Sequence, residues 1–219
     1  MSLFRLDASI RTEGSISREV ADTVEKAWRA EHPHAQVVRR DVGQEPLPAT
    51  SWRDAVGGWH TPAEQRTPQQ AEAVALSTTL LDELLDADAY LFAAPLYNYG
   101  VPQYLKAWID LIIANPGGTS AESPLLAGRP GVLVLVRGGG YGPGAPREGW
   151  DHAGPYLRRV LGDLWGLDLH VVEAELTLAG AVPAMASLVG LADESRRNAH
   201  VVADSHGRTL AQRMRAAAA

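Results

Sequence analysis

Short apolar runs alternate with longer amphipathic stretches along the whole chain. A near-continuous apolar run is typical of a strand covered on both faces, whereas apolar residues three or four positions apart are typical of a helix. Five segments are predicted as strands: "LFRLDAS" (3–9), "AQVVRRDVG" (35–43), "DAYLFAAP" (88–95), "RPGVLVLVRGGG" (129–140) and "LDLHVVEAE" (167–175).

Amphipathic segments fill the intervals between these strands. Helices are predicted over 15–32, 67–87, 101–114, 155–166 and 193–217. The second helix begins with Thr67 as N-cap, Pro68 at the first helical position and Gln70 at the third, which is a capping-box arrangement. Pro102 is expected in the first turn of the third helix, and the alanines after Arg215 are expected to fray.

The order of these elements predicts the fold class. Five strands alternating with five helices indicate an α/β protein with a parallel, doubly wound sheet and helices on both faces, of flavodoxin-like or Rossmann-like type. Residues 43–66 carry no clear period and are predicted to be a long surface excursion. We find no internal repeat or linker, and expect one domain over residues 1–219.

Composition excludes several classes of function. The chain has 20 basic and 26 acidic residues, a formal net charge of -6, and no basic cluster, so nucleic acid is not an expected partner. There is no cysteine, which removes disulfides and thiol nucleophiles and favours a reducing interior. No apolar run approaches the roughly 20 residues of a membrane span, so we expect a cytoplasmic protein with no membrane partner.

The histidines give no support for a metal site. His32 and His34 flank a proline at a helix end and are expected to be solvated or to complement the helix dipole. His200 and His206 are six positions apart on one helix and do not share a face. No Gly-x-Ser-x-Gly nucleophile motif occurs either, and no metal ligand is predicted.

The loop after the first strand has the composition of a phosphate site. The segment "DASIRTEGSIS" places Ser9, Thr12, Ser15 and Ser17 around a glycine at the start of the first helix. Unpaired N–H groups at a helix N-terminus attract anions, and hydroxyls can donate to phosphate oxygens. The alternative is that Ser15 or Ser17 simply caps the helix. Two arginines, Arg11 and Arg18, are counter-charge candidates or solvated side chains.

The loop after the third strand carries aromatic side chains. In "PLYNYGVP", Leu96, Tyr97 and Tyr99 could form a wall against a flat ring, and Asn98 offers an amide to a pyrimidine-like edge. Gly100 is expected to let the backbone turn closely. A turn whose tyrosines merely pack is the alternative.

The loop after the fourth strand is rich in glycine. "VRGGGYGPGAPREGWDHAG" contains seven glycines in nineteen residues, so N–H groups of Gly138 to Gly140 could approach a ligand carbonyl. Tyr141 could bond or cover that ligand, and His152 beside Asp151 is a conceivable proton donor. The alternative is a flexible linker. Phosphate donors, a ring platform and a glycine turn at one sheet edge together suit FMN.

At these residues the chain resembles the FMN-dependent NADH-azoreductase and flavodoxin-like NAD(P)H:quinone oxidoreductase family. The family's "P-M-Y-N-F" loop with "LK-x-x-x-D" is similar to "PLYNYGVPQYLKAWID", its "S-R-G-G" loop to Val136–Gly139, and its "PYL…FLGFIG" helix to "PYLRRVLGDLWG". Two positions depart from the pattern: Val136 replaces a serine, and Tyr141 falls near a histidine that adjoins the ring in the family. Substrate choice can therefore differ.

The resemblance implies a cofactor and a reaction. It implies a flavodoxin-like fold with FMN as prosthetic group, NADH or NADPH as hydride donor, and ping-pong transfer of two electrons to quinones or azo aromatics. No catalytic acid or base is required, and Tyr141 is a candidate stabiliser of reduced flavin. The implied FMN-binding residues are Ser9, Ser15, Ile16, Ser17, Pro95, Leu96, Tyr97, Asn98, Tyr99, Arg137, Gly138, Gly139 and Tyr141.

Family members are usually homodimers with active sites between the subunits. The resemblance therefore implies that the partner's segment 43–66 contributes to each pocket, with Trp52 and Trp59 as candidate walls or plain packing residues. Two other functions remain open. One is a flavodoxin-like electron carrier; the other is a specialised biosynthetic flavoenzyme or ligand-binding protein acting on an aromatic or quinone intermediate.

Overall fold

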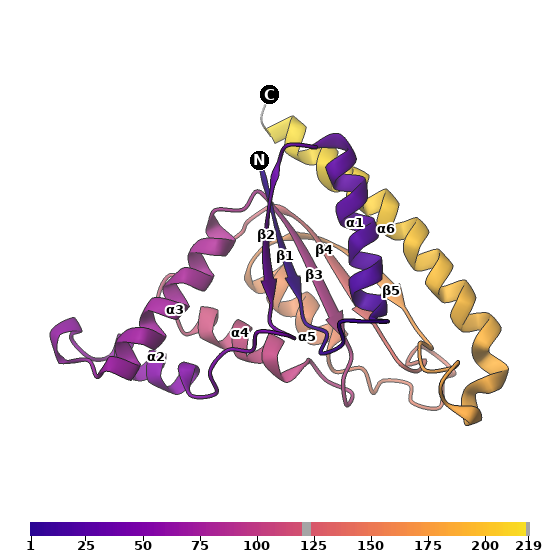
Figure 1. Ribbon diagram of the computed structural model, residues 1–219, viewed down its shortest axis with the longest axis horizontal. Coiled ribbons are helices and arrows are strands. Elements are labelled where there is room, and N and C mark those ends of the chain that lie inside the picture. The colour runs from indigo at the N-terminus through magenta and orange to yellow at the C-terminus, as the bar shows by residue number, and fades with distance from the viewer. Residues whose placement is uncertain (120–123, 218–219) are drawn as a thin grey trace.

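The computed structural model describes residues 1–119 and 124–217. All five predicted strands are present: β1 (Ser2–Asp7), β2 (Gln36–Asp41), β3 (Ala89–Pro95), β4 (Pro130–Val136) and β5 (Asp168–Ala174). They form one sheet in the order β2-β1-β3-β4-β5 with every neighbouring pair parallel (Figure 1). The carboxyl ends of the strands, and the loops that follow them, therefore lie at one edge of the sheet.

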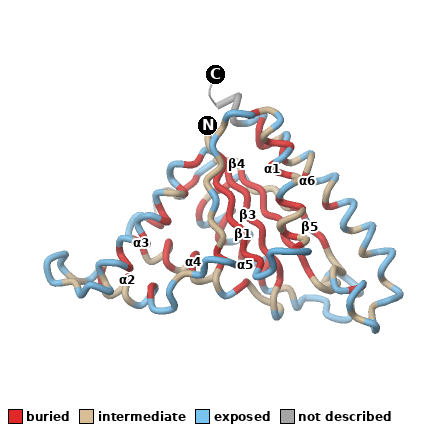
Figure 2. Tube along the Cα trace, viewed as in Figure 1, coloured by how far each residue is buried: buried red, intermediate tan, exposed pale blue. Residues whose placement is uncertain are grey.

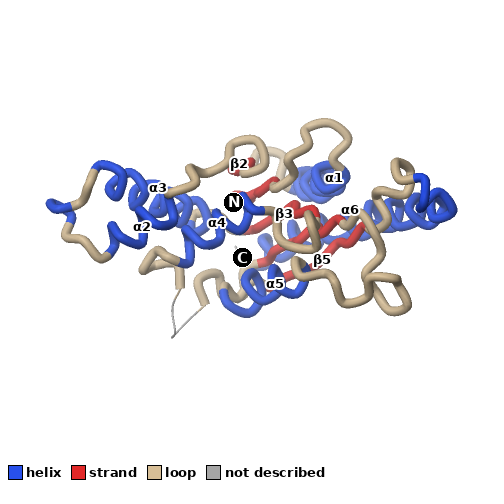
Figure 3. The backbone as a smooth tube through the Cα atoms, turned by 90° about the horizontal axis from the view of Figure 1, so that it is seen from below, coloured by secondary structure: helices blue, strands red, loops and turns tan. Residues whose placement is uncertain are grey.

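Helices cover both faces of this sheet, as predicted for a doubly wound fold. The helices are α1 (Ile16–Glu31), α2 (Ser51–Trp59), α3 (Pro68–Leu85), α4 (Gln103–Ile113), α5 (Gly154–Arg158) and α6 (Val189–Ala217). The hydrophobic core on one face joins the sheet to α1 and α6, and the core on the other joins it to α2, α3, α4 and α5 (Figure 3). Within the described residues, no helix is both long and apolar enough to cross a membrane.

The central strands are buried on both faces, which explains their near-continuous apolar sequences. Every residue of β3 is buried (Figure 2). Trp108 and Trp165 are fully buried and meet edge to face with ring centroids 5.7 Å apart. Phe4 of β1 stacks on Trp108 at 5.9 Å, so β1, α4 and the segment before β5 share one aromatic core.

Helix ends agree with the sequence where a specific cap is present. The capping box at α3 is confirmed, because the Gln70 amide donates to the Thr67 hydroxyl at 3.2 Å and the Thr67 amide donates to the Gln70 side chain at 3.0 Å. Pro102 is the N-cap of α4 rather than a residue of its first turn. Helix α6 starts at Val189, earlier than predicted, after a short 3-10 helix, and Ala218 and Ala219 of the predicted frayed tail lie outside the described residues.

The segment 43–66 is not the irregular excursion that its sequence predicts. It contains α2 and a short 3-10 helix, and α2 packs on α3 to form a projection at the side of the sheet (Figure 1). A Cβ on Gly58 would lie 2.7 Å from Val74 Cγ2, so close helix contact here uses glycine in place of an apolar side chain. Because glycine stands at a contact position of a helix of only nine residues, the apolar spacing typical of a helix is not visible in the sequence.

One of the two predicted roles of His32, that of a solvated side chain, is wrong; its role at the dipole of the helix that it ends stays a prediction. Its side chain is buried, not solvated, and its Nε2 lies 3.0 Å from the carbonyl oxygen of Ala211 in α6. The reason is that α6 packs along α1 and covers the end of α1, which a sequence pattern cannot show. His34 is exposed, as expected.

A buried ionic cluster joins β1 to α1. Arg5 is 2% exposed, and its guanidinium donates hydrogen bonds to Asp7 at 2.9 Å and 3.1 Å and to Glu25 at 2.9 Å. Burial alone would raise the pKa of Glu25, but hydrogen bonds from Arg29 and Arg5 outweigh it and hold that pKa below its ordinary value. The cluster therefore fixes the distance between β1 and the helix whose start faces the carboxyl edge.

We predict that Glu25→Gln lowers the free energy of unfolding at pH 7 by about 2 kcal/mol, because it leaves the buried Arg5 poorly compensated. The depressed pKa of Glu25 means that its stabilising effect is present above the unfolded-state pKa, about 4.3, and is lost as pH falls through the folded-state pKa. Urea unfolding should show the difference between wild type and variant shrinking below about pH 4.3. A difference that stays constant down to pH 3, or an equal loss in the exposed control Glu72→Gln, contradicts this account.

Candidate functional site

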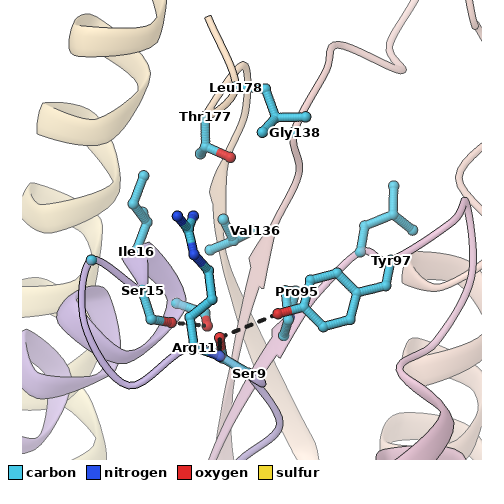
Figure 4. Close-up of a pocket in the computed structure, with 13 residues that line it drawn as sticks. Ser9, Arg11, Ser15, Ile16, Pro95, Tyr97, Val136, Gly138, Thr177 and Leu178 are labelled. Carbon is cyan, nitrogen blue, oxygen red and sulfur yellow. Dashed lines mark hydrogen bonds between the residues drawn. The ribbon is translucent and has the colours of Figure 1, made fainter. Parts of the chain in front are cut away.

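A cavity of about 220 Å³ opens at the carboxyl edge of the sheet (Figure 4). Four loops line it: those that follow β1, β3, β4 and β5. The lining residues are Ser9, Arg11, Gly14, Ser15, Ile16, Ser17, Pro95, Leu96, Tyr97, Val136, Gly138, Thr177 and Leu178.

Most of the predicted cofactor-binding residues meet in this cavity. Those that line it are Ser9, Ser15, Ile16, Ser17, Pro95, Leu96, Tyr97 and Gly138. Those that do not are Asn98, Tyr99, Arg137, Gly139 and Tyr141. Three segments therefore converge as predicted: the loop after β1, the end of β3 and Gly138. The tips of the loops after β3 and β4 do not reach the cavity lining.

The start of α1 presents free donors to the cavity. Ser15 is the N-cap, yet its side chain makes no capping hydrogen bond; its hydroxyl lies 3.2 Å from that of Ser17 instead. The first backbone bond of the helix runs from the Glu19 N–H to the Ser15 carbonyl at 3.0 Å, so earlier N–H groups have no partner inside the helix. Two hydroxyls beside unpaired N–H groups are a fitting donor set for a phosphate monoester.

Only one of the two predicted counter-charge residues reaches the cavity. Arg11 lines it, and its side chain extends across the opening in Figure 4. Arg18 lies behind the first loop and pairs with Asp41 at 2.6 Å and 2.8 Å, so it is neither a lining residue nor a solvated side chain. Sequence proximity alone could not separate these two roles.

Tyr97 connects the loops after β3 and β1. Its hydroxyl lies 3.3 Å from the Ser9 hydroxyl and accepts a hydrogen bond from the Ile10 N–H at 3.3 Å. The ring is thereby held as a wall of the cavity, together with Pro95 and Leu96. This is the flat, partly apolar surface that the sequence predicted for this loop.

The tight turn after Tyr97 is present, but Gly100 is not the residue with the unusual backbone conformation. Tyr97 and Gly100 exchange backbone hydrogen bonds of 3.2 Å and 2.9 Å, and the two residues between them, Asn98 and Tyr99, have φ values of 49° and 68°. Positive φ at both central positions defines the type I′ form of the two-residue hairpin turn. Gly100 therefore ends the turn and does not supply its tight backbone, while Tyr99 carries strain of about 1–3 kcal/mol.

The third loop packs around the ring of Tyr99. Tyr141 and Trp150 meet it edge to face at 6.3 Å and 5.3 Å, and the Arg147 guanidinium lies 5.3 Å from its centroid. Burial raises the pKa of the Tyr141 hydroxyl. These contacts draw Tyr99 and Tyr141 away from the cavity lining and favour a packed loop over the predicted alternative of a flexible linker.

Arg137 has a structural partner set instead of a cavity position. The residue is 8% exposed, and its guanidinium donates hydrogen bonds to Asp151 at 2.8 Å, Glu173 at 3.0 Å and Glu175 at 3.2 Å. Asp151 also accepts hydrogen bonds from the N–H groups of Ala153 and Gly154, at the start of α5. The arginine thus joins β4, β5 and α5. Its side chain does not line the cavity, and the FMN-binding role that the resemblance implies for it stays a prediction.

The loop after β5 was missed by the sequence analysis. Thr177 and Leu178 line the cavity, and their N–H groups donate to the carbonyls of Arg137 and Gly138 at 3.2 Å and 3.1 Å. A Cβ on Gly138 would lie 2.7 Å from Leu178 Cδ1, so the glycine allows this approach. The strand order could have indicated this loop. Because β5 ends at the same edge as the other strands, the loop that follows it also lies where ligands bind in such sheets.

The lining favours cofactor chemistry. One end carries hydroxyls, helix N–H groups and Arg11, and the rest is formed by Pro95, Leu96, Tyr97, Val136 and Leu178. No histidine, lysine or carboxylate is among the lining residues of the described chain, and His152, for which a proton-donor role was conceivable, is not one of them. A polar end for phosphate and an apolar remainder for a ring system fit FMN.

Comparison with known proteins agrees with this geometry. A family described as having a flavodoxin-like fold matches residues 1–196. An FMN-dependent NADH:quinone oxidoreductase of Parafrankia sp. (strain EAN1pec) is 40% identical over 204 residues, covering 92% of this chain and 96% of the relative. A protein of the same name from Streptomyces avermitilis is 40% identical over 216 residues, covering 98% and 99%. An azoreductase structure from Bacillus anthracis (str. Sterne) has a TM-score of 0.80 at 23% identity, covering 95% and 99%.

The doubly wound parallel sheet, with a serine-lined cavity at its carboxyl edge, thus defines a flavodoxin-like protein. The chain belongs to the flavodoxin-like family and, within it, to the FMN-dependent NADH:quinone oxidoreductases.

We predict that Gly43→Ala damages the first loop from behind. A Cβ at Gly43 would lie 2.1 Å from the carbonyl oxygen of Ser9, which is backbone and cannot move without shifting the loop. We expect a loss of unfolding free energy of about 1–3 kcal/mol and weaker FMN binding by flavin fluorescence titration. Gly142→Ala, where a Cβ would meet nothing within 4 Å, is the control. Unchanged FMN binding by a folded Gly43→Ala protein would refute this support role.

Proposed function

We propose that FMN binds in the carboxyl-edge cavity with its phosphate at the start of α1 and its ring system against Tyr97. The observation that carries the proposal is the uncapped start of α1, where the hydroxyls of Ser15 and Ser17 bond each other and leave the helix N–H groups free to bind an anion. Arg11 supplies the positive charge on the cavity side.

The protein residues bind and orient the cofactor. When bound, FMN supplies a two-electron centre that accepts hydride from NADH or NADPH and reduces a quinone or azo aromatic. Tyr97, Leu96 and Leu178 exclude water from the cavity walls. The Gly138 carbonyl accepts a hydrogen bond from the Leu178 N–H. Within the described residues the Gly138 N–H donates no backbone hydrogen bond, so it can donate to a ligand oxygen. No side-chain acid or base takes part.

The cavity supports a ping-pong order of substrates, in which the nicotinamide donor leaves before the acceptor binds. The described residues bring the three predicted loops to one cavity, so donor and acceptor would use the same side of the bound cofactor in turn. Initial-rate measurements should give parallel lines in double-reciprocal plots when NADH and a benzoquinone are varied together. Intersecting lines would reject this order while leaving the FMN-dependent activity intact.

Purified protein reconstituted with FMN should be yellow and should oxidise NADH or NADPH faster when a benzoquinone or an azo dye is added. Retention of FMN without any acceptor-dependent acceleration, with either nucleotide, would reject the oxidoreductase and favour the electron carrier. Failure to take up FMN at all would favour the ligand-binding alternative. The cytoplasmic location remains a prediction.

We predict that the double variant Ser15→Ala/Ser17→Ala weakens FMN binding by about tenfold, since two hydroxyl donors to the phosphate are lost. Riboflavin, which has no phosphate, should bind wild type and variant equally. Titration of the apoprotein by flavin fluorescence measures both constants. Equal loss of FMN and riboflavin affinity would place the phosphate elsewhere.

We also propose a homodimer in which α2 of the partner approaches the cavity. Trp52 on α2 is 55% exposed and lies on the projection formed with α3. By contrast, the ring of Trp59 is covered by Arg66, whose Cζ lies 5.7 Å from the ring centroid. Neither tryptophan lines the cavity of its own chain. Sedimentation of wild type and Trp52→Ser tests the proposal: a monomeric wild type rejects it, and a dimer weakened by Trp52→Ser supports it.

A further inference from the structure

Three consecutive carbonyl groups of the first loop accept hydrogen bonds from side chains that do not line the cavity. The Ser9 carbonyl accepts a hydrogen bond from Arg18 Nη2 at 2.8 Å, and the Arg11 carbonyl accepts one from Arg18 Nε at 2.9 Å. Between them, the Ile10 carbonyl accepts one from Gln44 Nε2 at 3.0 Å. One guanidinium and one amide therefore fix every carbonyl from residue 9 to residue 11.

Arg18 is itself held rigidly by Asp41 at the end of β2. Its Nη1 and Nη2 atoms lie 2.6 Å and 2.8 Å from the two carboxylate oxygens, and Asp41 also accepts the Gln44 N–H at 3.1 Å. Burial alone would raise the pKa of Asp41, but the hydrogen bonds and charge of Arg18 outweigh it, and the pKa lies below its ordinary value. The Arg18 charge is therefore neutralised locally, and the residue does not act as phosphate counter-charge.

The orientation of these carbonyls determines what the loop presents to the cavity. In a trans peptide the N–H group points away from the carbonyl that precedes it. Accordingly, the Ile10 N–H is directed at the Tyr97 hydroxyl at 3.3 Å and the Arg11 N–H at the Ser9 hydroxyl at 3.2 Å, and both of those residues line the cavity. If the carbonyls turned inward, their partial negative charge would face the phosphate.

We propose that Arg18, with Asp41 and Gln44, is a positioning unit that orients the backbone dipoles of residues 9–11 for an anionic ligand. It acts through the loop and touches no ligand. This inference rests on the proposed phosphate site at the start of α1, and it adds the statement that selectivity for the phosphorylated flavin depends on residues outside the cavity.

The test compares FMN with riboflavin, because the two ligands differ only in the phosphate. Apoprotein of wild type, Arg18→Met and Gln44→Met is titrated with each ligand by flavin fluorescence, and the melting temperature without ligand is recorded. Arg40→Met is the matched control. Arg40 lies on β2 and pairs with the carboxylate of Glu83, as Arg18 of α1 pairs with that of Asp41. The exposed fractions of the two side chains are similar, 21% for Arg40 and 16% for Arg18.

We expect Arg18→Met to reduce the preference for FMN over riboflavin by about tenfold, the effect of losing charge-assisted bonds that orient the loop. Gln44→Met should give a smaller reduction in the same direction. Arg40→Met should leave the preference unchanged even where it lowers the melting temperature. A purely structural role would lower both affinities together.

An unchanged FMN-to-riboflavin ratio in Arg18→Met overturns the positioning role. If that variant does not fold, Gln44→Met decides, because Gln44 is exposed and its loss does not open the core. A wild type that binds both ligands equally refutes the proposed phosphate site, and the positioning role with it. A wild type that prefers FMN while both variants keep that preference refutes the positioning role alone.

Discussion

The shared direction of the five strands is the constraint on which the site depends. Because every strand ends at the same edge, loops that are distant in sequence lie close together there. Four of them line the cavity, and the loop after β2 supports the first of these from behind, through Gly43 and Gln44. The site is therefore a property of the whole sheet, and each loop supplies only part of it.

Three arginines with little exposed surface hold backbone elements of this protein together. Arg5 ties β1 to α1, Arg18 ties the first loop to β2, and Arg137 ties β4 to β5 and α5. Each of these arginines is paired with carboxylates and none lines the cavity. The cavity instead offers hydroxyls, N–H groups and Arg11, a set suited to binding and orienting a cofactor that supplies the chemistry itself.

The sequence predicted the parts of the molecule whose signal is local. Apolar runs located all five strands, and the serines predicted as a phosphate site before α1 do line the cavity. Features that depend on packing were not predictable. Helix α2 was hidden by glycines that contact α3, and His32 was covered by a helix far along the chain.

Several predicted site residues lie outside the cavity lining for equally physical reasons. Arg137 follows the strand that ends in the cavity, but three carboxylates from β5, its loop and the α5 loop take its guanidinium. Tyr99 and Tyr141 are drawn into an aromatic cluster beyond the hairpin turn. Thr177 and Leu178 carry no motif, and only the common direction of the strands reveals that they reach the cavity.

A crystal structure of the protein reconstituted with FMN is the most direct test of the account. We expect the phosphate within hydrogen-bonding distance of the Ser15 and Ser17 hydroxyls and the N–H groups at the start of α1, with the flavin ring against Tyr97. A phosphate bound at another edge of the sheet, or a ring that lies away from Tyr97, would contradict it.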